Sequence, residues 1–157
     1  MQTLVIGYGN TLRSDDGVGF WVAEQIAVRN WPQVRSLSLH QLLPELAADM
    51  AQADQVYFID AWVGGSKPQL QQLAATPTTP TTDHGWTPES LMHLTKTLYG
   101  AEPLGYHLLI PAVQFDYGET QSAIAQAGMQ WAIQTLESRF GPPSPLAVGA
   151  AQEVRHA

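Results

Sequence analysis

Three aspartates and one histidine stand where their side chains could act on a ligand together. Asp15 and Asp16 follow the segment GYGNTLRS, Asp60 directly follows the apolar run VYFI, and His84 follows a tract rich in Thr and Pro. A carboxylate at the end of an apolar run is costly to bury unless it is paired or bound to a metal. Carboxylate oxygens and an imidazole nitrogen form an O/O/N site for a divalent metal that leaves positions open for water or substrate. The sequence therefore predicts a metal-contacting site assembled from distant parts of the chain.

Alternating strand and helix patterns would bring these residues together. Short apolar runs rich in β-branched residues predict strands over residues 3–7, 34–39, 55–61 and 106–113. Amphipathic spacing and capping residues predict helices over residues 17–29, 44–53, 87–99 and 118–140. This alternation predicts an α/β fold, a three-layer α/β/α sandwich around a mostly parallel twisted sheet. In such a sheet ligands bind outside the carboxyl ends of the strands, where the four candidate residues are expected.

Two segments do not fit a packed core. Residues 66–83 are expected to begin as a strand or ribbon and to continue as a mobile loop, and the Thr76–Asp83 tract could close over a substrate. Residues 141–157 are expected to form a flexible C-terminal tail after a single domain over residues 1–140. In the last predicted helix, the expected core residues are Ile124, Met129, Trp131, Ile133 and Leu136.

Composition excludes several classes of protein. The 157 residues carry 7 Lys and Arg against 14 Asp and Glu, a net charge of −7, and contain no Cys. An acidic chain without a basic stripe is a poor partner for nucleic acid or anionic membranes. The lack of Cys excludes disulfides, thiolate metal sites and a Cys nucleophile. No signal peptide and no membrane span is predicted, so a cytoplasmic location is expected.

Some of these residues also have a purely structural interpretation. Gly7 and Gly9 match only part of the dinucleotide-binding pattern G-x-G-x-x-G, with Leu12 in the third position, and are expected to form a tight turn with positive φ. One of Asp15 and Asp16 could simply cap the following helix. His93 and His107 fall inside a helix and a strand, which favours surface or structural roles.

Two alternative functions stay open on these residues. A phosphoacceptor receiver domain also has an acidic pair after its first strand and an Asp ending its third. Here five residues separate Asp15 from Gly9, and neither Lys67 nor Lys96 falls at a late strand end, as a receiver needs. A metal-dependent hydrolase of small molecules would fit the same three ligands.

The motifs GYGNTLRSDDGVG and FIDA, followed by an isolated His before a helix, resemble the [NiFe]-hydrogenase maturation endopeptidases. The resemblance extends from Leu4 to about Leu136. Enzymes of this family remove a C-terminal extension from the hydrogenase large subunit after nickel has been inserted. The resemblance implies that Asp16, Asp60 and His84 contact the metal and are the catalytic residues.

One segment departs from the common family pattern. Many members carry an Asp-x-Gly-Thr motif after the second strand, whereas this chain has His40-Gln41-Leu42. That segment is similar to the subgroup that serves bidirectional, NAD(P)-linked hydrogenases. The resemblance therefore implies substrate recognition by a set of residues around the site, namely His40, Gln41, Leu42, Asp15, Gly9 and Asn10.

The resemblance also implies the partner and the metal. The partner is a nickel-loaded large-subunit precursor, and the nickel belongs to that substrate, although Cd²⁺ or Zn²⁺ could substitute in vitro. No organic cofactor is expected. The chain has neither G-x-S-x-G nor H-E-x-x-H, which argues against the common serine and zinc protease machineries.

Overall fold

The computed structural model describes residues 1–74 and 85–142 of the chain. The strands are β1 (Thr3–Tyr8), β2 (Val34–Leu39), β3 (Gln55–Val63), β4 (Gln69–Leu73) and β5 (Leu104–Ala112). The helices are the short 3₁₀ helix η1 (Ser14–Gly17), α1 (Val18–Ala27), α2 (Leu46–Ala51), α3 (Pro88–Tyr99) and α4 (Ala123–Phe140).

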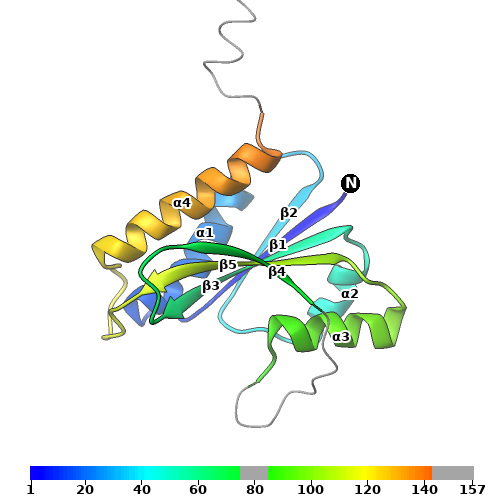
Figure 1. Ribbon diagram of the computed structural model, residues 1–157, viewed down its shortest axis with the longest axis horizontal. Coiled ribbons are helices and arrows are strands. Elements are labelled where there is room, and N and C mark those ends of the chain that lie inside the picture. Colours follow the sequence, from blue (N-terminus) through cyan, green and yellow to red (C-terminus); the bar gives the residue numbers. More distant parts are fainter. Residues whose placement is uncertain (75–84, 143–157) are drawn as a thin grey trace, which may run out of the picture.

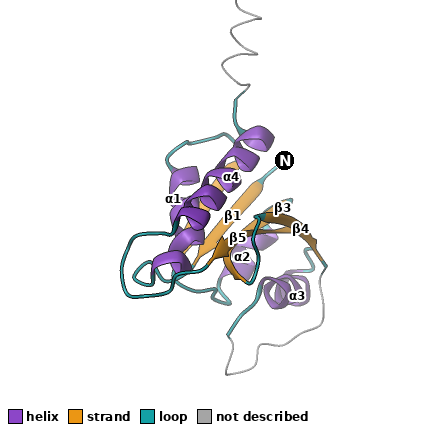
Figure 2. Ribbon diagram, turned by 60° about the vertical axis from the view of Figure 1, so that its left-hand side comes forward, coloured by secondary structure: helices purple, strands orange, loops and turns teal. Residues whose placement is uncertain are grey.

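The five strands form one sheet in the order β2-β1-β3-β5-β4. All neighbouring pairs are parallel except β4, which runs antiparallel to β5 at the edge. Helices α1 and α4 cover one face of the sheet and α2 and α3 cover the other (Figures 1 and 2). The prediction of a three-layer α/β/α sandwich with a mostly parallel sheet is confirmed.

Alternation along the strands divides the core between the two faces. Successive side chains of a strand point to opposite faces, so Val5, Tyr57 and Ile59 pack under α1 and α4. Their neighbours Ile6 and Phe58 pack under α2 and α3. Tyr8 and Asp60 come two residues after Ile6 and Phe58, so their side chains lie on the same face of the sheet, the face covered by α2 and α3.

Glycines allow α1 to pack directly against the sheet. A Cβ at Gly7 would lie 1.9 Å from the carbonyl oxygen of Gly19 in α1, and one at Gly19 would lie 2.2 Å from the carbonyl oxygen of Ile59. Gly9 has the expected positive φ, at 148°. Gly7 is an ordinary strand residue of β1, so the prediction that it shares the positive-φ turn is wrong, and close helix packing is what requires a glycine there.

The last helix differs from its prediction in extent and in core residues. It begins at Ala123 rather than Gly118, because Ser122 accepts a hydrogen bond from the Ala125 N–H and caps it. Its fully buried positions are Ala125, Gly128, Ala132 and Leu136. Of the residues expected in the core only Leu136 is fully buried, and the larger Met129, Trp131 and Ile133 pack at its border. Small residues let α4 approach β5 closely.

The other expected segments lie partly outside the described residues. The strand expected at the start of residues 66–83 is β4, whereas the loop expected over Thr76–Asp83 and the tail expected over 141–157 fall almost entirely on residues that the structure does not describe. Among the helices of residues 1–74 and 85–142, none has the length and apolar character needed to cross a membrane.

Candidate functional site

The carboxyl ends of β1 and β3 place two polar side chains side by side. Gly7 of β1 is paired with Ile59 of β3, so Tyr8 and Asp60 lie level on neighbouring strands. The Tyr8 hydroxyl donates a hydrogen bond of 3.0 Å to Oδ2 of Asp60. Asp60 was predicted as a site residue, whereas Tyr8 was not, because a Tyr between two glycines gives no local sign of its partner.

The surroundings of Asp60 disfavour its charged form. Burial raises the pKa of this carboxyl to about 6, and the negative charge of Asp16 adds to the rise. Hydrogen bonds from the Tyr8 hydroxyl and the Ala61 N–H act in the opposite direction. Asp60 is therefore poised to exchange a proton, or to gain a cation, near neutral pH.

His107 of β5 lies on the same side of the sheet. It is paired with Phe58, and its Nε2 is 3.9 Å from Oδ2 of Asp60, which is too long for a hydrogen bond. Its side chain is 14% exposed, and Nε2 has no hydrogen-bond partner among the described residues. Burial lowers the pKa of His107, and the charge of Glu89 in α3 partly opposes this effect. His107 is thus a neutral, unpaired imidazole at the inner edge of the site.

Asp16 approaches from the loop between β1 and α1. The backbone N–H of Asn10 donates a hydrogen bond of 2.9 Å to Oδ2 of Asp16, which fixes this carboxylate over the G-Y-G-N turn. A Cβ at Gly9 would lie 1.9 Å from the carbonyl oxygen of Asp16, so only glycine permits this approach. The effect of Asp16 on the pKa of Asp60 places the two carboxylates in one electrostatic environment.

Asp15 has a different environment from Asp16. It is fully buried and accepts hydrogen bonds from the N–H groups of Val113, Gln114 and Ser122 and from the Ser122 hydroxyl, at 2.7–3.0 Å. Burial alone would raise the pKa of Asp15, but these hydrogen bonds hold it below the usual value. Asp15, expected to take part in substrate recognition, ties the loop after β1 to the loop after β5.

The segment after β2 borders the site. The His40 ring is exposed and stacks on Phe20 of α1, with ring centroids 5.3 Å apart. Gln41 is exposed and Leu42 is buried in the core under α2 and α3. Of this predicted recognition segment, His40 and Gln41 are therefore available to a partner, while Leu42 anchors the segment.

The third predicted metal contact, His84, lies outside the described residues. The described chain resumes at Gly85, two residues before Thr87, which caps α3. Within residues 1–74 and 85–142, no three His, Asp or Glu side chains come close enough to hold a metal ion by themselves. Asp16 and Asp60 are the two members of the predicted donor set that the structure describes.

The arrangement does not favour the receiver interpretation. A receiver requires both members of its acidic pair at the site, but Asp15 is enclosed by four hydrogen bonds from residues 113–122. Lys67 lies between β3 and β4, and Lys96 is on α3 beside Glu102. Neither lysine is at a strand end.

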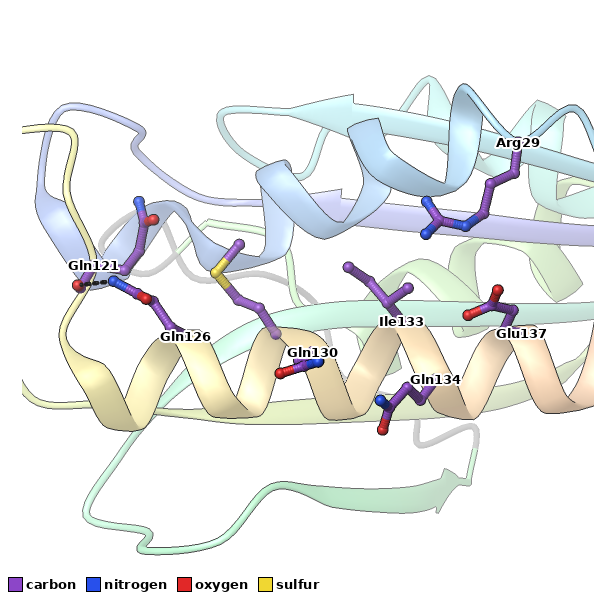
Figure 3. A pocket seen from close by; sticks show the side chains of 8 residues that line it. Arg29, Gln121, Gln126, Gln130, Ile133, Gln134 and Glu137 are labelled. Carbon is purple, nitrogen blue, oxygen red and sulfur yellow. Dashed lines mark hydrogen bonds between the residues drawn. The ribbon is translucent and has the colours of Figure 1, made fainter.

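A cavity lies away from this site, between α1 and α4. It is open to solvent, has a volume of about 380 Å³ and is lined by Arg29 and by seven residues from α4 and the turn before it, among them Met129 and Ile133 (Figure 3). Glutamine side chains dominate the rest of the lining, and Gln126 donates a hydrogen bond to the Gln121 carbonyl. None of its lining residues belongs to the acidic site.

Several solved structures with the same fold are named as hydrogenase maturation proteases. The endopeptidase HybD from E. coli aligns with a TM-score of 0.73 and 20% identity, over 88% of this chain and 91% of that chain. The [NiFe] hydrogenase maturation proteases HycI and HybD from Thermococcus kodakarensis align with TM-scores of 0.69 and 0.70 at 20% and 19% identity. These alignments cover 87% and 89% of this chain, and 90% and 99% of those chains. No family model and no curated protein matches the sequence. By its structure, the chain has the fold of the [NiFe] hydrogenase maturation proteases.

Proposed function

We propose that this chain is an endopeptidase that removes the C-terminal extension of a [NiFe]-hydrogenase large-subunit precursor. In this proposal the nickel already held by the precursor is part of the substrate. Asp16, Asp60 and His84 contact that nickel, so that only the metal-loaded precursor docks productively. Cd²⁺ or Zn²⁺ could take the place of nickel in vitro.

The observation that carries the proposal is the electrostatic influence of Asp16 on the buried Asp60 at the carboxyl edge of this fold. Asp60 near the carboxyl end of β3 and Asp16 in the segment after β1 are both acidic; burial is the main cause of the raised pKa of Asp60, and the negative charge of Asp16 adds to it. A divalent cation relieves the repulsion. The same fold occurs in solved proteins named hydrogenase maturation proteases.

The residues of the site suit amide hydrolysis. In the proposed reaction, water adds to the scissile carbonyl carbon and Asp60 accepts a proton from it. The proton passes to the departing nitrogen as the C–N bond breaks. The Tyr8 hydroxyl, at 3.0 Å, holds Asp60 in place. The nickel of the precursor, contacted by Asp16, Asp60 and His84, would supply Lewis acidity that polarises the scissile carbonyl.

The segment His40-Gln41-Leu42 supports a narrower proposal about the substrate. We propose that the precursor belongs to a bidirectional, NAD(P)-linked hydrogenase, because this segment is similar to that of the subgroup serving such enzymes. His40 and Gln41 are exposed beside the site and can contact the substrate. Processing of that precursor, and failure to process large subunits of other hydrogenases, is the expected result; the opposite preference would contradict this narrower proposal.

The function is tested with purified protein and purified precursor. Nickel-loaded and metal-free forms are incubated with the enzyme, and the loss of the extension is followed by mass spectrometry. The loaded form should be cut and the metal-free form should stay intact. Equal cutting of both forms would contradict nickel-dependent recognition, and cutting of neither would contradict the endopeptidase proposal.

A further inference from the structure

Exposed apolar side chains gather on the loops beside the acidic site. Leu12 is 44% exposed, Val113 is 63% exposed and Tyr117 is 86% exposed, and all three follow the carboxyl ends of β1 or β5. Leu43 and Val63, after β2 and at the end of β3, are also exposed. Single exposed apolar residues are ordinary on a protein surface, but a group of them at one edge indicates an interaction site.

Backbone hydrogen bonds join the two loops into one unit, which we call the loop platform (residues 9–17 and 113–122). The Gly118 N–H donates to the Leu12 carbonyl and the Ser14 N–H donates to the Gly118 carbonyl, both at 2.8 Å. The Asp15 N–H donates to the Gln114 carbonyl at 2.9 Å, and the Asp15 side chain adds the contacts described above. The two loops lie side by side beyond the strand ends in Figure 1. The apolar side chains are therefore carried on a fixed backbone, which lowers the entropic cost of binding.

The loop platform is continuous with the acidic site. Asp16 belongs to the same loop as Leu12, and Leu12 is joined directly to Gly118, the neighbour of Tyr117. A molecule bound at Asp16 therefore has Leu12 on the same loop and Tyr117 on the loop that is hydrogen bonded to it.

The charges of the loop platform indicate the character of the occupant. Asp116 and Glu119 flank Tyr117 and are exposed. The one basic residue of the platform, Arg13, lies over the Phe115 ring, with its guanidinium carbon 5.9 Å from the ring centroid. Arg13 is exposed as well, but the exposed charges next to Tyr117 in the chain are negative, and these complement apolar side chains accompanied by a basic one.

We propose that the loop platform is the docking surface for the precursor segment that adjoins the cleavage point. That segment binds as an extended chain, with an apolar side chain against Tyr117 and Leu12 and a basic side chain beside Asp116 and Glu119. This inference rests on the proposed function, because it takes the precursor as the occupant.

The test compares Tyr117→Ser with Tyr99→Ser in processing of the nickel-loaded precursor. Tyr99 is also an exposed tyrosine, but it ends α3 at the opposite edge of the sheet. Because aromatic residues are frequent energetic centres of interfaces, Tyr117→Ser should raise KM roughly tenfold while kcat stays within about twofold. Tyr99→Ser should leave both constants unchanged. Thermal unfolding of each variant checks that the fold is intact.

A second variant tests the charged border. Glu119→Gln should raise KM at low salt, and the difference from the unaltered protein should disappear at high salt, since exposed charges are screened. If the unaltered protein processes the precursor but Tyr117→Ser and Glu119→Gln behave like Tyr99→Ser, the docking inference is wrong. If the unaltered protein does not process the precursor at all, it is the proposed function that fails.

Discussion

At the scale of single residues, Asp60 is expected to limit the stability of the protein. Its pKa of about 6 in the fold exceeds the value of 3.8 of a free side chain, so folding favours the protonated form. The stabilising contribution of that form is complete below pH 4 and is lost as the pH rises through 6. At pH 7 the charged Asp60 therefore destabilises the protein, by about 1–2 kcal/mol after allowance for its partial exposure.

Asp60→Asn should accordingly raise the free energy of unfolding at pH 7 and abolish processing of the precursor. Denaturant unfolding at pH 7 and at pH 4 measures the first effect, and the gain should vanish at pH 4. A variant that is no more stable at pH 7, or that still processes the precursor, would remove Asp60 from the role given to it here.

Tyr8 is expected to act through Asp60. Tyr8→Phe removes the hydroxyl that donates to Oδ2 of Asp60, and that hydrogen bond favours the carboxylate. The pKa of Asp60 should therefore rise above its present value, which carbonyl ¹³C NMR of labelled Asp can follow. Tyr99→Phe, at an exposed tyrosine on α3, is the matched control and should leave the titration unchanged. A downward shift in Tyr8→Phe would contradict this arrangement.

A place in the site could be predicted for a residue whose chemistry conflicts with its neighbours in the sequence. Asp60 stands out because a carboxylate follows four apolar residues. His107 does not stand out, because only the register of β5 against β3 brings it to within 3.9 Å of Asp60. Asp15 and Asp16 look equivalent in the sequence, and only partners about 100 residues further along the chain distinguish them.

At the scale of elements, Asp15 holds together the loops that follow β1 and β5. Asp15→Asn places an amide where a carboxylate accepts four hydrogen bonds. The NH₂ group of the new side chain would then face at least one of the N–H or O–H groups that donate to Asp15. The expected loss is about 2–4 kcal/mol of the free energy of unfolding, as for buried hydrogen bonds to a charged group. Because its pKa is held low, the contribution of Asp15 is present above pH 4 and is lost as the pH falls below that.

The neighbouring substitution Asp16→Asn is the matched control for this loss. Asp16 accepts only the Asn10 N–H among the described residues, a bond that an Asn side chain can also accept. Asp16→Asn should change stability by less than about 1 kcal/mol and still abolish processing. Chemical denaturation of both variants is the measurement, and equal destabilisation by the two would contradict the distinction between these residues.

Strands and helices could be predicted where the local sequence pattern alone determines them. The β2 range and the start of β3 agree with prediction, and Thr87 caps α3 as its sequence indicates. The direction of β4 was not predictable, because its short sequence QLQQL is compatible with either pairing. The start of α4 was misplaced because residues 118–122 bind the loop after β1 instead of entering the helix.

At the scale of the whole molecule, the alternation of strands and helices predicted the three layers and the mostly parallel sheet that the structure has. Parallel strands carry their carboxyl ends to one edge, and this brings Asp16 and Asp60 together although 43 residues separate them in the chain. In the proposed function, part of the net charge of −7 serves at this edge to attract the cation that the precursor carries.

The most direct test of this account is a crystal of the protein soaked in Cd²⁺ and measured at a wavelength where cadmium scatters anomalously. We predict one dominant peak within about 2.0–2.6 Å of carboxylate oxygens of both Asp16 and Asp60 and of a His84 nitrogen. Asp60→Asn crystals soaked in the same way should lose that peak. A dominant peak bound to other side chains, with none between Asp16 and Asp60, would contradict the account.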